Sequence, residues 1–281
     1  MKNVSTFQCP LCGFTGPEGF KLYYRGEVTL HRCRRCGFVG QFLTSASIAE
    51  DHQSWCSEKT LAASAGFLYP QMRRLHQDTI RRILRRKGSP RLLDVGCGDG
   101  HFLHWCRRAG IEAVGVEYNE AVAARAAATT GAPIIRGRYE KNLFGPKEFD
   151  VITFIQVLEH LPDPRAAVEA ASHHLRGEGL IVIEVPSIRS PHFLAYGATG
   201  IKWFVRPPAG VIKWHVAYYS PRTLRRLAES AGFRTLQLVT GRWGCKYSGL
   251  LGMIGRLADP LLNLTRVGGI HYIGVKQGCC S

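Results

Sequence analysis

Short apolar runs recur between residues 91 and 185 and alternate with segments of helical periodicity. The run FDVITFI, residues 149–155, is almost continuously apolar, as expected of a parallel strand that is covered on both faces. Helices are predicted between the strands, at 120–130 and 162–176. This alternation predicts an α/β fold, a doubly wound sheet whose ligands bind beyond the carboxyl ends of its strands. The predicted strands are 92–95, 112–116, 134–135, 149–155 and 179–185.

The flanking segments extend this pattern. Leu75, Thr79 and Ile83 recur at helical spacing, and arginines occupy the opposite face, so a helix is predicted to pack against the sheet before its first strand. Ser220 followed by Pro221 predicts a capped helix that runs to residue 231. Two last, antiparallel strands are predicted at 236–240 and 272–275.

A glycine turn follows the first predicted strand. The glycines at 96, 98 and 100 let backbone amides approach a ligand at the start of the next helix. Their spacing differs from the Gly-x-Gly-x-x-Gly of a dinucleotide site, which disfavours NAD. Asp94 ends the strand before the turn, and Glu117 ends the second strand, where a carboxylate can accept hydrogen bonds from ribose hydroxyls.

Two Cys-x-x-Cys pairs stand near the N-terminus, formed by Cys9 and Cys12 and by Cys33 and Cys36. Each pair is followed by Gly-Phe. Four thiolates at this spacing predict a tetrahedral zinc site of the zinc-ribbon type, which is structural because no coordination position stays open. Redox chemistry of the Cys-x-x-Cys type is the alternative.

At Asp94, the glycine turn and Glu117 the chain resembles the class I S-adenosylmethionine-dependent methyltransferases, from about residue 91 to 276. The resemblance implies a seven-stranded Rossmann-like sheet that binds S-adenosylmethionine through Asp94, Gly96, Gly98 and Glu117. It also implies that Glu140 lies against the adenine.

The segment QVLEHLPDP, residues 156–164, resembles the Glu-His-Leu-x-Asp-Pro element of small-molecule members of this class. The resemblance places Gln156 beside the cofactor and His160 at the rim of the reaction chamber. His215, in WHVAYYS, matches the family's His-x-x-x-Phe-Ser element, with Tyr219 where Phe is usual. Each histidine is a candidate general base, and each has an equally good structural interpretation as an anchor.

The domain organisation follows from these motifs. Residues 1–56 are expected to form a zinc-ribbon domain and connector, and 57–281 the methyltransferase domain. An aromatic and basic insertion at 186–219 is expected to fold as a lid over the cofactor. A second insertion, 241–269, is rich in Leu, Ile and Met and is expected to be amphipathic, lying on a membrane surface, on a lipid-like substrate, in the core or at a homodimer contact.

Charge is distributed unevenly and narrows the choice of partner. Residues 181–281 hold 13 Lys and Arg against 3 Asp and Glu, whereas 91–180 hold 10 against 12. The basic C-terminal part favours an anionic partner, or serves only solubility. The first residues lack the apolar core of a signal peptide, so we expect a cytoplasmic protein, peripheral at the inner membrane surface if the second insertion binds lipid.

The expected function is methyl transfer to oxygen or carbon of a small or lipid-linked acceptor such as a sugar, a quinone or a natural-product intermediate. The absence of Asn-Pro-Pro-Tyr or Pro-Cys after the fourth strand disfavours methylation of base nitrogen or of cytosine C5. An RNA methyltransferase, with the ribbon and the arginine-rich helix on the RNA backbone, is the first alternative. A non-catalytic cofactor-binding scaffold is the second.

Overall fold

A computed structural model describes residues 7–16, 21–24, 28–41, 58–189, 215–241, 257 and 269–278 of the 281-residue chain, with side chains from residue 73 onward in the first helix. Most of the predicted lid and of the amphipathic insertion therefore lies outside the described residues. Within the described part of the chain, no helix is long and apolar enough to cross a membrane.

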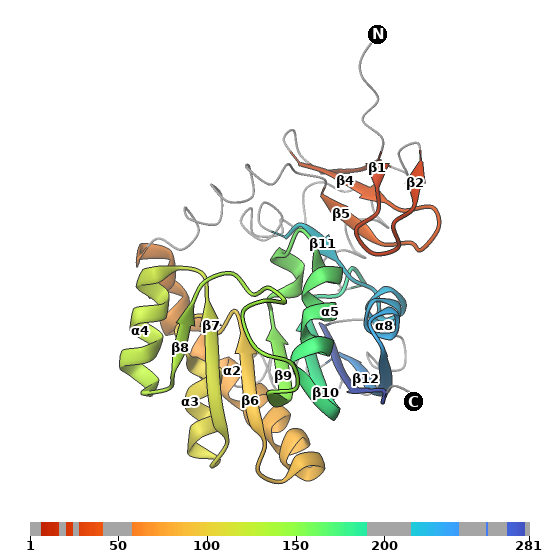
Figure 1. The fold of residues 1–281 in the computed structure, drawn as a ribbon. Helices are drawn as coiled ribbons and strands as arrows, with labels where there is room; N and C mark the ends of the chain where they lie inside the picture. Colours follow the sequence, from red (N-terminus) through yellow and green to blue (C-terminus); the bar gives the residue numbers. More distant parts are fainter. Residues whose placement is uncertain are drawn as a thin grey trace.

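A seven-stranded sheet forms the centre of the molecule (Figure 1). Its order is β12-β13-β10-β9-β6-β7-β8, and β13 runs in the direction opposite to the other six strands. The predicted fold class is thus confirmed. The strands are β6 (Arg91–Val95), β7 (Glu112–Glu117), β8 (Ile134–Arg136), β9 (Phe149–Ile155), β10 (Leu175–Val185), β12 (Phe233–Gly241) and β13 (Gly269–Lys276).

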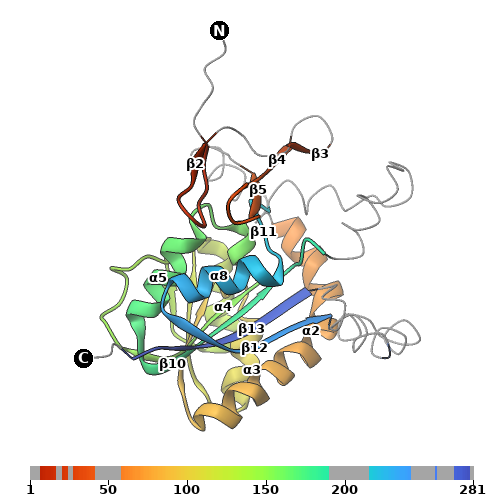
Figure 2. The ribbon, with the colours of Figure 1, turned by 90° about the vertical axis from the view of Figure 1, so that its right-hand side faces the viewer.

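Helices cover both faces of this sheet, as Figure 2 shows edge-on. One apolar core joins a face of the sheet to α2 (Glu58–Lys87), α3 (His101–Arg108) and α4 (Glu120–Thr130). The other joins the opposite face to α5 (Pro164–His174) and α8 (Pro221–Ser230). Ile83 and Leu103 on the first side, and Val168 and Leu224 on the second, have no exposed surface. Burial on both faces explains the continuous apolar strands.

Helix ends follow the predicted capping residues. Ser220 accepts a hydrogen bond from the Thr223 amide, and Thr223 bonds back to the Ser220 amide, which completes a capping box with Pro221 at the first helical position. Several boundaries differ from the prediction: α5 is shorter than the predicted 162–176, and β12 and β13 each begin three residues earlier than predicted. α5 ends at His174, and β10 begins at Leu175 instead of residue 179, because Leu175 already pairs with Phe149 before a register shift leads to Leu180.

The N-terminal residues form two small sheets above the carboxyl ends of the central strands (Figure 1). β1 (Phe7–Gln8) pairs with β2 (Thr15–Gly16), and β3 (Lys21–Tyr24), β4 (Val28–Arg32) and β5 (Val39–Gln41) form an antiparallel sheet. We call residues 7–41 the ribbon. A fourth strand, β11 (Ala217–Tyr218), pairs with β5 and comes from the end of the predicted lid segment. The ribbon therefore shares a sheet with the larger domain.

Candidate functional site

The glycine turn lies between β6 and α3 in a left-handed conformation. Gly96, Gly98 and Gly100 have φ values of 65°, 55° and 84°. The amides of Gly96 and Cys97 both donate to the carbonyl oxygen of Val116, at 2.8 and 3.0 Å, which ties the turn to β7. A Cβ at Gly96 would lie 2.7 Å from Val157, whereas a Cβ at Gly98 would meet no atom within 4 Å. Gly98 thus presents bare backbone to open space, as a ligand cradle requires.

Glu117 lies directly beside this turn. Its carboxylate accepts the Gly98 amide at 3.0 Å and the Asn119 amide at 2.9 Å. Asn119 in turn caps α4 by accepting the amide of Val122. Burial raises the pKa of Glu117, and these backbone hydrogen bonds oppose the shift. The acid predicted from its spacing is therefore held in one orientation against the glycine turn.

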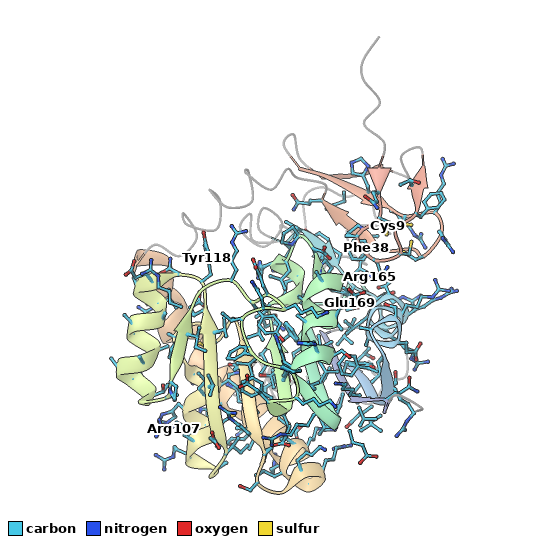
Figure 3. The ribbon with its side chains drawn as sticks, in the orientation of Figure 1. Cys9, Phe38, Arg107, Tyr118, Arg165 and Glu169 are labelled. Carbon is cyan, nitrogen blue, oxygen red and sulfur yellow. The ribbon has the colours of Figure 1, made fainter. Side chains whose placement is uncertain are left out.

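A surface cavity of about 540 Å³ opens between the first turns of α4 and the residues at the ends of β7 and β8, and Glu117 itself is not among its lining residues. Its lining includes Tyr118, Asn119, Arg136 and Gly137. Figure 3 shows Tyr118 at the edge of the domain where the strands end, and the Arg138 guanidinium lies over the Tyr118 ring, 5.1 Å from its centroid. Glu140 is exposed and is not among the lining residues, so its role stays a prediction.

Asp94 is buried beneath the turn. Thr153 on β9 donates a 2.6 Å hydrogen bond to its carboxyl, and only 3% of the residue surface is exposed. Burial, together with the charges of Glu117 and Glu184, raises the pKa of Asp94 to about 7, although the hydrogen bond from Thr153 favours the ionised form. The carboxyl is consequently half protonated near neutral pH.

This raised pKa makes folding stability depend on pH. The folded protein holds the proton up to about pH 7, whereas the unfolded chain releases it near the ordinary value of 3.8, so stability falls as the pH rises between these values. The cost of ionisation is on the order of 4 kcal/mol. We expect Asp94→Asn, which keeps an acceptor for Thr153, to lose less stability than wild type between pH 4 and 7 in urea unfolding. Parallel profiles for the two proteins would contradict this.

Gln156 follows β9 in a left-handed conformation, with φ of 58°. Its amide donates to the Glu184 carbonyl at 2.8 Å. A non-glycine residue in this region carries strain that tends to mark functional sites. The turn directs the chain from β9 into η1 (Leu158–His160), which carries the predicted His160.

His160 and His215 come together although they are far apart in sequence. Their rings meet edge to face, with centroids 4.8 Å apart. Glu159 is 1% exposed, and ligand atoms of Glu159, His160 and His215 all lie within 4.8 Å of one another. Such a group can hold and move a proton, or bind a divalent cation. The two base candidates thus belong to one cluster at the carboxyl end of β9.

The sequence analysis did not predict a cluster of three buried polar side chains. Thr79 on α2 donates to Glu184 on β10 at 2.8 Å, and His271 on β13 lies 3.3 Å from both. At most 2% of each residue is exposed. The signal was a charged residue inside the apolar run LIVIEV, because a carboxylate in a covered strand needs polar partners.

The four predicted cysteines meet at one point of the ribbon. The Sγ–Sγ distance is 3.6 Å from Cys9 to Cys36 and 3.7 Å from Cys12 to Cys33. Zinc with four Zn–S bonds of about 2.3 Å requires sulfur separations of about 3.8 Å, so the residues fit the ion. A disulfide would need about 2.05 Å. The hydrogen bond between the side chains of Cys9 and Cys36 lowers the pKa of Cys36 to about 5 and raises that of Cys9.

Both knuckles use the same backbone turn. The Cys9 amide donates to Phe14 and the Cys33 amide to Phe38, while Gly13 and Gly37 donate back to the carbonyls of the two cysteines. The two glycines have φ values of 66° and 77°, which explains the Gly-Phe that follows each pair. Figure 3 shows Cys9 and Phe38 in the ribbon, above the larger domain.

Curated proteins similar to this chain include ubiquinone biosynthesis O-methyltransferases. The protein from Cereibacter sphaeroides is 33% identical over 148 residues, which are 50% of this chain and 59% of that protein. The protein from Alkalilimnicola ehrlichii is 27% identical over 164 residues, 56% of this chain and 66% of the relative. The chain therefore spans about three fifths of the length of the curated relatives that it matches.

A solved structure similar in fold is the 1,6-didemethyltoxoflavin-N1-methyltransferase of Burkholderia thailandensis, with 1,6-didemethyltoxoflavin and S-adenosylhomocysteine bound. It is 14% identical, with a TM-score of 0.58, over 92% of this chain and 99% of that one.

A family model described as a methyltransferase domain matches residues 69–238, more than half of the chain. This span includes the glycine turn, Glu117 and the histidine cluster. The family that the sequence resembles is thereby confirmed, and the chain belongs to the methyltransferase domain family.

Proposed function

We propose that the protein transfers a methyl group from S-adenosylmethionine to an oxygen or carbon atom of a small or lipid-linked acceptor. The observation that carries the proposal is Glu117, whose carboxylate is held against the glycine turn by the Gly98 and Asn119 amides. A carboxylate in this place suits the two ribose hydroxyls of an adenosyl group. The open space at Gly98 and the rings and backbone at Tyr118 and Gly137 suit the rest of that group.

The chain's own residues would mainly position the reactants. When bound, S-adenosylmethionine supplies a methyl group on a good leaving group, so alignment and exclusion of water account for much of the rate. One imidazole of the His160 and His215 pair then accepts the single proton of an acceptor hydroxyl, and the other ring lies against it. The names of the curated relatives favour a phenolic, quinone-like acceptor, whose hydroxyl an imidazole can deprotonate near neutral pH.

We also propose that the ribbon binds a zinc ion whose role is structural. The proposal is supported by the four sulfur atoms, whose spacing matches a closed tetrahedral site.

A lipid-linked acceptor would be reached at a membrane surface, and we propose that the protein makes peripheral contact with that surface. Sedimentation with anionic vesicles tests this contact.

The cofactor site is tested by S-adenosylhomocysteine, the product-like ligand. At about 100 times its Kd it should stabilise the protein by about 2.7 kcal/mol and raise Tm by several degrees. Glu117→Ala removes the carboxylate that accepts hydrogen bonds from the two ribose hydroxyls of the ligand. Each of these charge-assisted bonds contributes about 1.5–3 kcal/mol, so calorimetry should show that S-adenosylhomocysteine binds with at least a ~100-fold weaker Kd.

Glu112→Ala is the matched control. It removes the same residue type from the other end of β7, where Glu112 is exposed and contacts only Arg91 among the ion pairs of the described residues. Its affinity should equal that of wild type. An unchanged Tm of the wild-type protein with the ligand would overturn the proposed function.

A further inference from the structure

The ribbon touches the main domain through a hydrogen-bonded strand pair. In the β5–β11 ladder Gly40 lies opposite Ala217, and Val39 opposite Tyr218. Gln41 extends the ladder by two further bonds, from its amide to the Val216 carbonyl and from its Nε2 to the His215 carbonyl, both 2.8 Å. The side chain of Gln41 thus holds the backbone of a base candidate from 174 residues away.

The same return segment is bonded to η1. The Val216 amide donates to the Glu159 carbonyl at 2.8 Å, and the Tyr219 hydroxyl donates to the Leu158 carbonyl at 3.1 Å. Gln41, Val216 and Glu159 therefore form a continuous series of backbone hydrogen bonds from the ribbon to the loop that carries His160. The ring of His215 meets the ring of His160 at the end of this series.

The cysteine cluster fixes the other end of the series. The Phe38 amide donates to Cys36 Sγ at 3.4 Å, and the Phe38 ring packs edge to face on Tyr219, with centroids 5.9 Å apart. Phe38 is 1% exposed and Tyr219 is fully buried. A Cβ at Gly40 would lie 2.8 Å from the Val216 carbonyl oxygen, which is closer than a side chain tolerates. A larger residue at position 40 would therefore push the ribbon away from the return segment. One apolar core contains both the cysteines and α8.

We propose that the ribbon holds the histidine cluster of the acceptor site in place and that Gln41 is a positioning residue for His215. The ribbon's metal centre thereby controls methyl transfer without contacting either reactant. This inference rests on the proposed function, because it assigns the histidine cluster to the acceptor. It predicts that damage to the β5–β11 contact lowers turnover while the cofactor site, formed by β6 and β7, keeps its affinity.

The variant Gln41→Met tests this assignment, because methionine keeps the length of the side chain and removes the donor to His215. A lost hydrogen bond that displaces a base should lower kcat for methylation of 3,4-dihydroxybenzoate about tenfold and shift the pH profile of kcat. The Kd of S-adenosylhomocysteine and the zinc content should equal those of wild type. In ¹⁵N-histidine-labelled protein, the imidazole signals of His215 should move.

Arg35→Gln is the control, since Arg35 is an exposed residue of the same knuckle as Cys33 and Cys36. It should change neither kcat nor the imidazole signals. Unmoved His215 signals in Gln41→Met would overturn the inference, as would unchanged kcat beside an active wild type. If Gln41→Met does not fold, Gln41→Asn, one methylene shorter, takes its place. If neither folds, chelating the metal from wild type must move the His215 signals, and unmoved signals would overturn the inference.

Failure of the proposed function gives a different result. A wild-type protein that neither binds S-adenosylhomocysteine nor methylates any acceptor contradicts the methyltransferase assignment. The imidazole signals still report whether Gln41 positions His215 in that case.

Discussion

Cys33→Ser is expected to release zinc and unfold the ribbon. Cys33 is 1% exposed and lies 3.7 Å from Cys12 across the four-sulfur cluster. A structural zinc ion contributes about 10–16 kcal/mol to folding in small zinc domains, far more than so few residues can gain from their own core. Removing one of four thiolates should remove most of this stabilisation. Zinc content, measured by plasma emission spectroscopy, should fall from about one ion per chain to near zero.

Hydrogen exchange should locate the damage. The amides of Cys33 and Gly37, which form the knuckle turn, should lose protection, while β6 and β7 keep theirs. Cys106→Ala is the control for loss of a buried thiol, because Cys106 is fully buried between α3 and the sheet. A Cys33→Ser protein with normal zinc content would contradict a four-thiolate site.

Replacing both His160 and His215 with alanine is expected to have the largest effect on turnover. General base catalysis contributes roughly 10²–10⁴-fold, and two rings in contact act on the same proton. We expect each single variant to lose about 100-fold in kcat, and the double variant to lose little more than either single variant. The losses should be less than multiplicative, since members of one unit are not independent.

Affinity separates this role from a purely structural one. Both histidines lie outside the glycine turn, so the Kd of S-adenosylhomocysteine should stay within about twofold of wild type, within the usual scatter for independent sites. His173→Ala, at the end of α5, is the control and should be fully active. Wild-type kcat in both single variants would reject base catalysis by histidine.

Local sequence patterns were sufficient to predict most strands of the sheet and the capping residues of the helices. The apolar run of β9 and the limits of α4 agree with the structure, as does the capping box at Ser220. These features depend on neighbouring residues, so their signals lie within a few positions. The start of β10 was misplaced because its first pair, Leu175 with Phe149, precedes a register shift that no periodicity reveals.

Site residues could be predicted where they stand at a characteristic spacing in the sequence. They could not be predicted where the contact joins residues that are distant in the sequence. The cysteine pairs and the interval from Gly98 to Glu117 are local and were found. The contact of Gln41 with His215 and the contacts of Thr79 with Glu184 and His271 each join residues more than 100 positions apart. A single polar residue in an apolar strand shows that a partner exists without showing which residue it is.

The pairing of β5 with β11 also bears on how the chain is made. During synthesis the ribbon emerges before β11, and this strand, which completes its sheet, follows only after more than 170 further residues. Until then the nascent chain exposes an open strand edge and the apolar ring of Phe38, both of which favour association with other chains. Closing so long a loop is an entropic cost that delays this contact. Early metal capture would protect the nascent ribbon through that interval.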